Sequence, residues 1–268
     1  MTPVLATVIC LLSIFVATTA GAACVFFFKK NFSPRLASTV NGLASGIMLS
    51  VSVFGLVLPA MDGAKESGPF INVPWVPVIV GFLLGCLLLY ALDKIVPHIH
   101  QNKEQFAEGP RNTKLDKNTK FFLAVTMHNI PEGIAVGLAA SMCVLNPSDP
   151  GLMWGAISLA IAIAIQNFPE GAAVSIPLFE DGQSKGKSFL YGFLSGVVEP
   201  IFGVIAFFLA GWLGQDLMPW LLSFAGGAMV YVTVEELIPD IKGDDESHFG
   251  IWSFIIGFMF MMLMELVL

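Results

Sequence analysis

Residues 128–133 read His-Asn-Ile-Pro-Glu-Gly, and this polar stretch interrupts an otherwise apolar segment at 121–140. Residues 166–171, Gln-Asn-Phe-Pro-Glu-Gly, repeat almost the same order of residue types inside the next apolar segment. Ionisable side chains are rare inside apolar segments of this length, and where they occur they usually serve a function. The two stretches therefore decide the fold and mark where we expect the chemistry.

The composition places the chain among membrane proteins. Its 268 residues are 56% hydrophobic and 12% charged, with a mean hydropathy of +0.79, which is too apolar for a soluble domain. An apolar helix needs about 20 residues to cross a bilayer. The sequence therefore predicts an all-α membrane protein that forms one transmembrane domain over residues 1–268. Its eight predicted transmembrane helices lie near 4–28, 36–58, 73–96, 121–145, 152–178, 188–213, 217–239 and 249–268.

The basic residues predict the orientation of these spans. The longest polar stretch is a linker at 97–120, and almost every Lys and Arg lies in this linker or in loops on the same side of the membrane. Only Lys65 falls in the opposite set. Because Lys and Arg are enriched in cytoplasmic loops, the linker is expected in the cytoplasm and both termini outside. We expect a multi-pass protein of the plasma (inner) membrane, embedded in the lipid bilayer.

Internal similarity suggests a repeated architecture. The Gly-Ile-Met stretch at 46–48 in the second span parallels Gly-Ala-Met at 227–229 in the seventh, and residues 79–82 in the third span parallel 255–258 in the eighth. Related helices five spans apart cross the membrane in opposite directions. This predicts a 3+2+3 inverted repeat, an arrangement found in many secondary transporters. The first and sixth spans show no convincing match to each other.

Polar side chains from three adjacent spans are expected to meet at one depth. Within each motif, the first polar residue and the glutamate are four residues apart, so they lie on one helical face. The prolines at 131 and 169 lack an N–H and free a backbone carbonyl near these side chains. The expected cluster consists of His128, Asn129, Glu132, Gln166, Asn167, Glu170 and Glu199.

The charge of this cluster indicates what it binds. A carboxylate at the bilayer centre costs about 3 kcal/mol, so three impose roughly 9 kcal/mol. No Lys or Arg lies in the core of any span, and the counter-charge must therefore be protons or bound cations. An oxygen-rich site with one imidazole suits a divalent metal such as Zn²⁺, Fe²⁺, Mn²⁺ or Cd²⁺.

The paired motifs on the fourth and fifth of eight spans resemble those of the ZIP family of zinc and iron transporters. Gln166 and the Glu-Pro pair at 199–200 resemble its GufA-like branch most. The resemblance covers the whole chain. It implies a metal site from His128, Glu132, Gln166 and Glu170, and an adjoining one from Asn129, Asn167 and Glu199 that Glu132 and Glu170 bridge. It further implies a homodimer, import of metal into the cytosol, and movement of one helix bundle relative to the other.

Two positions depart from the family pattern. Many relatives have His where this chain has Gln166, and some members of the branch have Asp where it has Asn167. An amide in place of a carboxylate removes negative charge from the second position. Arrangements with one and with two metal ions both remain open.

Weaker signals lie toward the cytoplasmic side. Glu235 and Glu236, near the end of the seventh span, are expected to receive metal as it leaves, although an acidic pair facing water would have the same sequence. His98 and His100 in the linker are compatible with metal binding or with a solvated loop.

Three functions compete for these residues. The leading hypothesis is a transporter of divalent metal, with Zn²⁺ as its transported substrate. The alternative is a proton-conducting or proton-coupled relay of carboxylates. An intramembrane metallohydrolase would need a pairing such as His-Glu-x-x-His, and no second histidine lies in any span. We therefore expect no enzymatic activity and no nucleic-acid partner.

Overall fold

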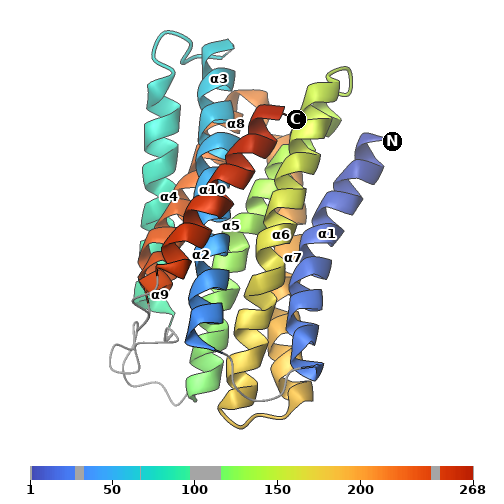
Figure 1. The fold of residues 1–268 in the computed structure, drawn as a ribbon. Helices are drawn as coiled ribbons and strands as arrows, with labels where there is room; N and C mark the ends of the chain where they lie inside the picture. Colours follow the sequence, from blue (N-terminus) through green and yellow to red (C-terminus); the bar gives the residue numbers. More distant parts are fainter. Residues whose placement is uncertain (1, 28–32, 67, 97–115, 243–247, 268) are drawn as a thin grey trace.

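The computed structural model describes residues 2–27, 33–66, 68–96, 116–242 and 248–267, and within these ranges every regular element is a helix. Long helices run side by side along the height of the molecule (Figure 1). The prediction of an all-α protein is confirmed. The elements are α1 (Pro3–Ala23), η1 (Cys24–Phe26), α2 (Pro34–Ser50), η2 (Val51–Val57), α3 (Leu58–Glu66), α4 (Trp75–Ile95), α5 (Lys117–Leu145), α6 (Pro150–Glu180), α7 (Lys185–Leu213), η3 (Gln215–Leu217), α8 (Met218–Val232), η4 (Thr233–Leu237), α9 (Ile238–Lys242) and α10 (Phe249–Val267).

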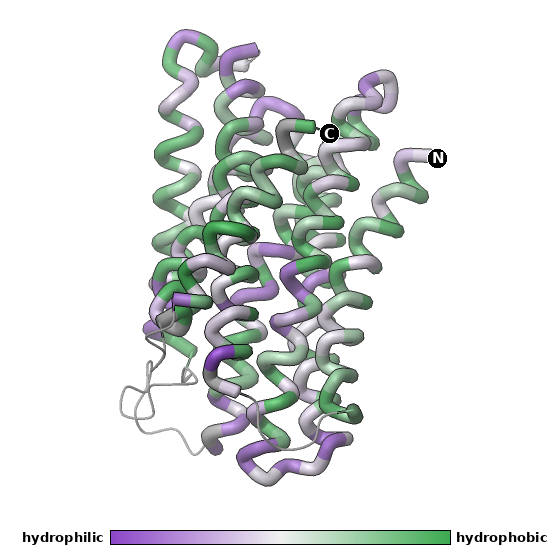
Figure 2. Tube along the Cα trace, viewed as in Figure 1, coloured by the Kyte–Doolittle hydropathy of each residue, from purple (hydrophilic) through white to green (hydrophobic). Residues whose placement is uncertain are grey.

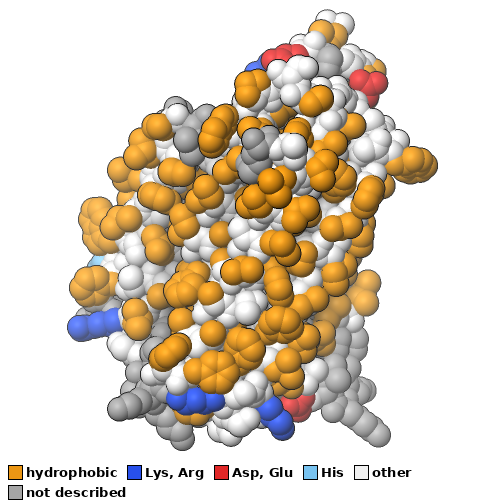
Figure 3. Space-filling view, turned by 90° about the vertical axis from the view of Figure 1, so that its right-hand side faces the viewer, with side chains coloured by type: hydrophobic (Ala, Val, Ile, Leu, Met, Phe, Trp, Pro, Cys, Tyr) orange, Lys and Arg blue, Asp and Glu red, His pale blue; other side chains and the backbone are white. Residues whose placement is uncertain are grey.

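Seven helical segments in the described ranges are long and apolar enough to cross a membrane, and they match the first seven predicted spans. For the eighth, the apolar helix within the described part of α10, Phe249–Met264, is shorter. Hydrophobic side chains cover most of the face in Figure 3, and most Lys and Arg gather at its lower end. Trp212 and Trp252 are 82% and 63% exposed, as expected where hydrocarbon rather than water surrounds the protein. These are the features of a multi-pass membrane protein.

Two predicted boundaries differ from the structure. The second span, predicted at 36–58, continues as helix through η2 and α3 to Glu66. An ion pair between Lys65 Nζ and Asp62 Oδ1 at 2.9 Å, one turn apart, supports this polar extension. The predicted linker at 97–120 ends earlier, because α5 begins at Lys117. The rest of that linker, at 97–115, lies outside the described residues.

Local sequence signals explain where several helices begin. Asp149 precedes α6, and its side chain accepts a hydrogen bond from the Gly151 N–H at 2.9 Å. Ser184 caps α7 in the same way through the Lys187 N–H. Thr2 caps α1, which has proline at its first position, where no N–H is needed.

The helices pack most extensively in four pairs: α1 with α6, α5 with α7, α2 with α10, and α4 with α8. Glycines allow the close approach within each pair. Gly46 of α2 lies against the backbone carbonyl of Phe254 in α10, and Gly227 of α8 lies against that of Phe82 in α4. A side chain at either glycine would collide with backbone, so these contacts fix how the paired helices sit on each other.

Two spans contain a π-helical stretch, η2 after α2 and η4 after α8. A hydroxyl follows the start of each stretch and bonds to a carbonyl one turn earlier. Ser52 donates to the Met48 carbonyl at 2.7 Å, and Thr233 donates to the Met229 carbonyl at 2.8 Å. A π-helical turn inserts an extra residue into the helix and is frequent at functional sites.

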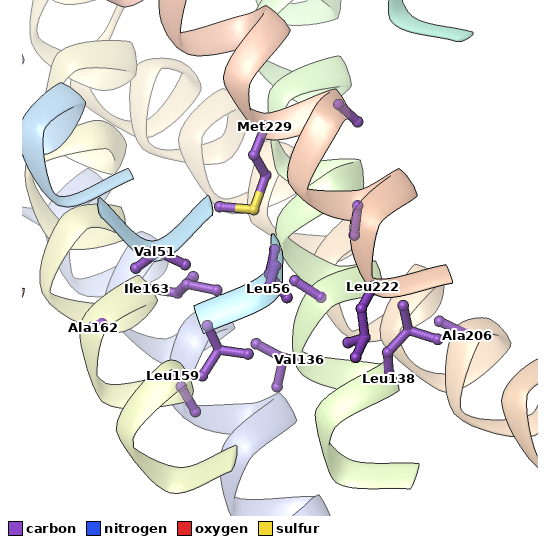
Figure 4. Close-up of a cluster of buried hydrophobic side chains, with 14 of the residues drawn as sticks. Val51, Leu56, Val136, Leu138, Leu159, Ala162, Ile163, Ala206, Leu222 and Met229 are labelled. Atoms are coloured by element: carbon purple, nitrogen blue, oxygen red, sulfur yellow. The ribbon is translucent and has the colours of Figure 1, made fainter. Parts of the chain in front are cut away.

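A hydrophobic core fills the bundle toward the end at which the α5–α6 connection lies (Figures 1 and 4). Helices α2, α5, α6, α7 and α8, together with η2, contribute to it. Met48 and Met229, from the two parallel Gly-x-Met stretches, are at most 1% exposed and belong to this core. Their role is packing. The residues labelled in Figure 4 are Val51, Leu56, Val136, Leu138, Leu159, Ala162, Ile163, Ala206, Leu222 and Met229.

Candidate metal site

The two motifs lie on α5 and α6, which continue as helices through Pro131 and Pro169. Figure 2 shows hydrophilic residues at mid-height, inside spans that are otherwise largely hydrophobic. Gly133 lies against the backbone carbonyl of Glu199 in α7, and Gly171 lies against that of Thr18 in α1. The glycine of each motif therefore brings a third and a fourth helix up to the polar side chains.

Gln166 links the two motifs. Its side-chain amide donates one hydrogen bond to Glu132 Oε1 at 2.8 Å and another to Glu170 Oε2 at 2.6 Å. Gln166 and Glu132 are almost completely buried, whereas Glu170 is half-buried. The NH₂ group thus lies between two carboxylates, in a place where a cation would also be stabilised.

His128 joins this cluster to the seventh span. Its Nε2 contacts Glu236 Oε1, and both side chains are at least nine-tenths buried. Glu236 belongs to the π-helical stretch η4. The structure therefore brings Glu236 into contact with a motif residue, whereas the sequence predicted only that Glu236 lies near the end of its span.

A second group forms between α5, α7 and α1. Asn129 donates to Glu199 Oε1 at 3.1 Å and to the Ser195 carbonyl at 3.0 Å. Thr18 donates to the same Glu199 oxygen at 2.6 Å. Sequence reasoning missed Thr18, because the first span showed no match to the sixth. A signal existed, since Thr18 and Glu199 are 181 residues apart, the same separation as Gly46 and Gly227.

Several buried polar atoms of the predicted site residues have no hydrogen-bond partner among the described residues. The carboxylates also interact electrostatically with one another in every pairing. A concentration of unpaired oxygens beside like charges is the arrangement that a bound cation stabilises. The atoms are Asn129 Oδ1, Glu132 Oε2, Gln166 Oε1, Asn167 Oδ1 and Nδ2, Glu170 Oε1 and Glu199 Oε2.

These side chains do not form a ready-made ligand cage. Within the described ranges, no three His, Cys, Asp or Glu side chains come together as a metal site. Hydrogen bonds from Gln166, Asn129 and Thr18 occupy one oxygen of each carboxylate instead. In the place that the Gln166 NH₂ group occupies, a metal ion can therefore bind only if this amide turns away from Glu132 and Glu170.

Access to the cluster comes from one end. A pocket of about 70 Å³ is lined by His128, Glu170 and Glu236, together with Asn41 of α2 and Phe121 near the start of α5. Toward the opposite end, the hydrophobic core lies on the same helices (Figure 4). The cluster is thus reached from the end at which α5 begins and is covered by apolar side chains on the other side.

The remaining predicted residues are placed less centrally. Glu235 is half-buried and is not among the residues that line this pocket. His98 and His100 lie outside the described residues. The four cysteines carry no disulfide, as expected for small buried or half-buried side chains, and Cys10 and Cys143 are fully buried.

Comparison with known proteins bears on the same residues. The family model described as "ZIP Zinc transporter" matches residues 117–265, which include both motifs. The chain is 31% identical to the human protein named Zinc transporter ZIP11, over 92% of this chain and 93% of that protein. It is 36% identical to Zinc transporter GufA of Myxococcus xanthus, over 81% and 82%. It is 29% identical to Zinc transporter ZupT of Chlorobium chlorochromatii, over 93% of each.

The model spans more than half of the chain, and the relatives cover most of it. These matches confirm the resemblance drawn from the paired motifs and from Glu199. They also agree with the expectation of a transporter rather than an enzyme. The chain belongs to the ZIP family of zinc transporters.

Proposed function

We propose that this protein carries Zn²⁺ across the membrane into the cytosol through a site in the middle of the bundle. The observation that carries the proposal is the group of three glutamates, on α5, α6 and α7, whose second oxygens are buried and have no hydrogen-bond partner in the part of the chain that the structure describes. Membership in the ZIP family and the names of the relatives support zinc as the substrate.

The site has two adjoining positions. His128, Glu132, Gln166 and Glu170 form the first, where one imidazole and two carboxylates offer the ligands that zinc prefers. Zinc takes the place that the Gln166 NH₂ group occupies between the two glutamates, and the Gln166 carbonyl oxygen becomes available. Binding of the dication replaces the amide dipole of Gln166 by a full positive charge between the two carboxylates.

The second position has only oxygen ligands. Asn129, Asn167 and Glu199 supply it, and Glu132 and Glu170 lie between the two positions. With an amide rather than a carboxylate at Asn167, it carries less negative charge than the first. We infer that it binds an ion more weakly and holds it only during transit.

Charge favours a reversible cation site over a purely structural cluster. Each buried carboxylate costs about 3 kcal/mol in the membrane, and each has only one oxygen hydrogen-bonded to a described side chain. No Lys or Arg lies in the core of a span to neutralise them. A passing dication offsets this cost without a permanent positive side chain.

The direction of transport follows from access and from the basic residues. The pocket that contains His128 and Glu170 is also lined by Phe121, near the start of α5. In the sequence, the predicted linker at 97–120 leads into this end of α5. The distribution of Lys and Arg supports a cytoplasmic position for that linker, with both termini outside and the protein in the plasma (inner) membrane. We infer that the described conformation faces the cytosol and that Glu236 and Glu235 receive the ion on its way out.

The packing supports a 3+2+3 inverted repeat. In such a repeat, α1, α2 and α4 correspond to α7, α8 and α10, and α5 corresponds to α6. The contact of α1 with α6 is then equivalent to that of α7 with α5, and the contact of α2 with α10 is equivalent to that of α8 with α4. These are the four most extensive contacts in the described chain. The matching hydroxyl bonds of Ser52 and Thr233 at the two π-helical stretches follow the same correspondence.

Two further features come from the family resemblance. We propose a homodimer, which mass measurement of the detergent-solubilised protein by light scattering tests. Fe²⁺, Mn²⁺ and Cd²⁺ are proposed as additional substrates because their ligand preferences overlap those of zinc at an oxygen and imidazole site. The alternative of a pure proton relay is not favoured by membership in a family of metal transporters.

The test is zinc uptake into proteoliposomes that contain the purified protein and an internal zinc-sensitive dye. The His128→Ala variant is expected to lose most of the uptake, and the matched His248→Ala variant at the start of α10 is expected to keep it. Flux of protons down a pH gradient with no zinc uptake by the unmodified protein would refute the function, and unchanged zinc uptake in His128→Ala would refute the site.

A further inference from the structure

Thr18 of α1 contacts the candidate site although neither motif includes it. Its hydroxyl donates to Glu199 Oε1 at 2.6 Å, and both side chains are at most 1% exposed. A hydrogen bond to an ionised acceptor is shorter and about twice as strong as one between neutral groups. The pair is therefore a strong polar contact within an interface of α1 and α7 that also contains Phe15 against Phe193.

The hydroxyl has a choice of acceptors. The Ile14 carbonyl, one turn earlier in α1, lies 3.2 Å from the Thr18 oxygen. A threonine has one hydrogen to donate, and the shorter distance assigns it to Glu199. A hydrogen bond to Glu199 is not required for α1 to form. In the same helix, the Thr7 hydroxyl donates to the Pro3 carbonyl, which lies four residues earlier.

Packing fixes the side chain in this orientation. A Cβ on Gly196 of α7 would lie 3.0 Å from Cβ and from Cγ2 of Thr18, so the Thr18 methyl group packs on that glycine. The Thr18 carbonyl lies against Gly171 of α6. With its methyl group and its backbone both held, the hydroxyl has little freedom to turn away from Glu199.

The consequence is a carboxylate with two different oxygens. Thr18 and Asn129 both donate to Glu199 Oε1. Glu199 Oε2 is buried and has no hydrogen-bond partner in the described part of the chain, and the same holds for Asn129 Oδ1. Two donors on one oxygen set the rotation of the carboxylate and leave the other oxygen for a ligand.

We propose that Thr18 is a positioning residue for the second cation position: by holding Glu199 Oε1, it presents Glu199 Oε2 to the ion. The inference rests on the proposed function, since it names a residue that acts on the same site through Glu199. It assigns α1 a role in the affinity for the ion in addition to its packing.

The experiment compares three variants by calorimetric zinc titration of the purified protein and by uptake kinetics. Thr18→Val keeps the shape and removes the hydroxyl, and Thr18→Ser restores the hydroxyl. Thr7→Val removes a hydroxyl that bonds only within α1 and serves as the control. Loss of a hydrogen bond to a charged group predicts, for Thr18→Val, a decrease of about ten-fold in the affinity of the weaker of the two zinc sites, with the stronger site unchanged. The KM of uptake is expected to rise, with Vmax less affected. Thr18→Ser and Thr7→Val are expected to stay within about three-fold of the unmodified protein.

A double-mutant cycle separates positioning from packing. In a Glu199→Gln background, Thr18→Val is expected to have no further effect on zinc affinity, because the group that Thr18 orients is already altered. Thr18→Ala replaces Thr18→Val in the cycle if the valine variant does not purify as a folded protein.

Unchanged zinc affinity in Thr18→Val, or an equal loss in Thr18→Ser, would overturn the inference while leaving the proposed function intact. The proposed function itself fails if the unmodified protein neither binds nor transports zinc. The two failures are therefore distinguishable in one set of measurements.

Discussion

The two motifs of this protein share a backbone arrangement and differ in their chemistry. In each, a proline and a glutamate precede a glycine that lies against the carbonyl of a neighbouring helix, Glu199 for the α5 motif and Thr18 for the α6 motif. The neighbour is an acid in one case and an alcohol in the other. At the first motif position, His128 contacts Glu236, whereas Gln166 bonds to the two motif glutamates.

This difference separates the features that the two motifs share from those in which they differ. The common features are those that glycine and proline impose on the backbone. The differing features are the side chains that carry charge or bind metal. The α5 side supplies His128 and Glu132 and contacts Glu199 and Glu236, whereas the α6 side supplies Gln166 and Glu170 and contacts Thr18. The imidazole and three of these four acids thus lie on the α5 side.

The largest expected effect contrasts the two motif glutamates. Glu132→Gln is expected to lower zinc uptake by at least about 100-fold, and Glu170→Gln by about ten-fold, because altered metal ligation typically costs ten- to a hundred-fold or more. Glu132 is fully buried and lies near both other carboxylates, whereas Glu170 is half-buried in the pocket. Initial uptake rates in proteoliposomes measure the difference, with Glu66→Gln at the exposed end of α3 as the control. Equal losses in the two variants would contradict the asymmetry.

The next effect tests the shared backbone. Gly133→Ala and Gly171→Ala each place a methyl group against a backbone carbonyl, and each is expected to destabilise the protein by about 2–3 kcal/mol, or roughly 5–10 °C in Tm. Thermal unfolding in detergent measures it.

The control for these variants is Gly155→Ala in α6, where a Cβ meets nothing within 4 Å. That substitution is expected to leave the stability unchanged or slightly raised, since alanine favours helix over glycine. A loss at only one of the two motif glycines would show that the helix pairs are not equivalent.

The smallest effect concerns the contact that only the α5 motif makes. Glu236→Gln is expected to lower the Vmax of uptake about three-fold with a smaller change in KM, because a neutral amide binds the imidazole of His128 less strongly as the ion departs. Glu235→Gln, one residue away and not part of the pocket lining, is expected to lower Vmax less than Glu236→Gln does. If both variants have the same kinetics, contact with His128 does not contribute to release.

The sequence predicted what depends on composition and on helical spacing. The spans follow from apolar length, and the shared face of Gln166 and Glu170 follows from a four-residue separation, which their hydrogen bond confirms. The second span was predicted too short because apolar length alone ends it at 58, although an ion pair between Asp62 and Lys65, one turn apart, stabilises helix beyond that point.

The missed features depend on contacts between distant segments. In the proposed repeat, Thr18 corresponds to Glu199, but a comparison of residue types does not match an alcohol with an acid. The π-helical stretches were also missed, since the residue types of Thr233–Leu237 are compatible with ordinary α-helix. The contact between Glu236 and His128 follows from that local geometry and could not be derived from spacing alone.

The glycine contacts within the helix pairs have a consequence for movement. Along α7, α5 presents Gly133 and, one turn later, Gly137, which lies against the Gly203 carbonyl. Gly171 of α6 has no such neighbour, since Asn167 and Ser175 lie one turn before and after it. Sliding of α6 along α1 by one turn would therefore press a side chain against the Thr18 backbone. We expect α1 and α6 to shift as one rigid body, which keeps Glu170 at a constant distance from the Thr18 backbone during transport.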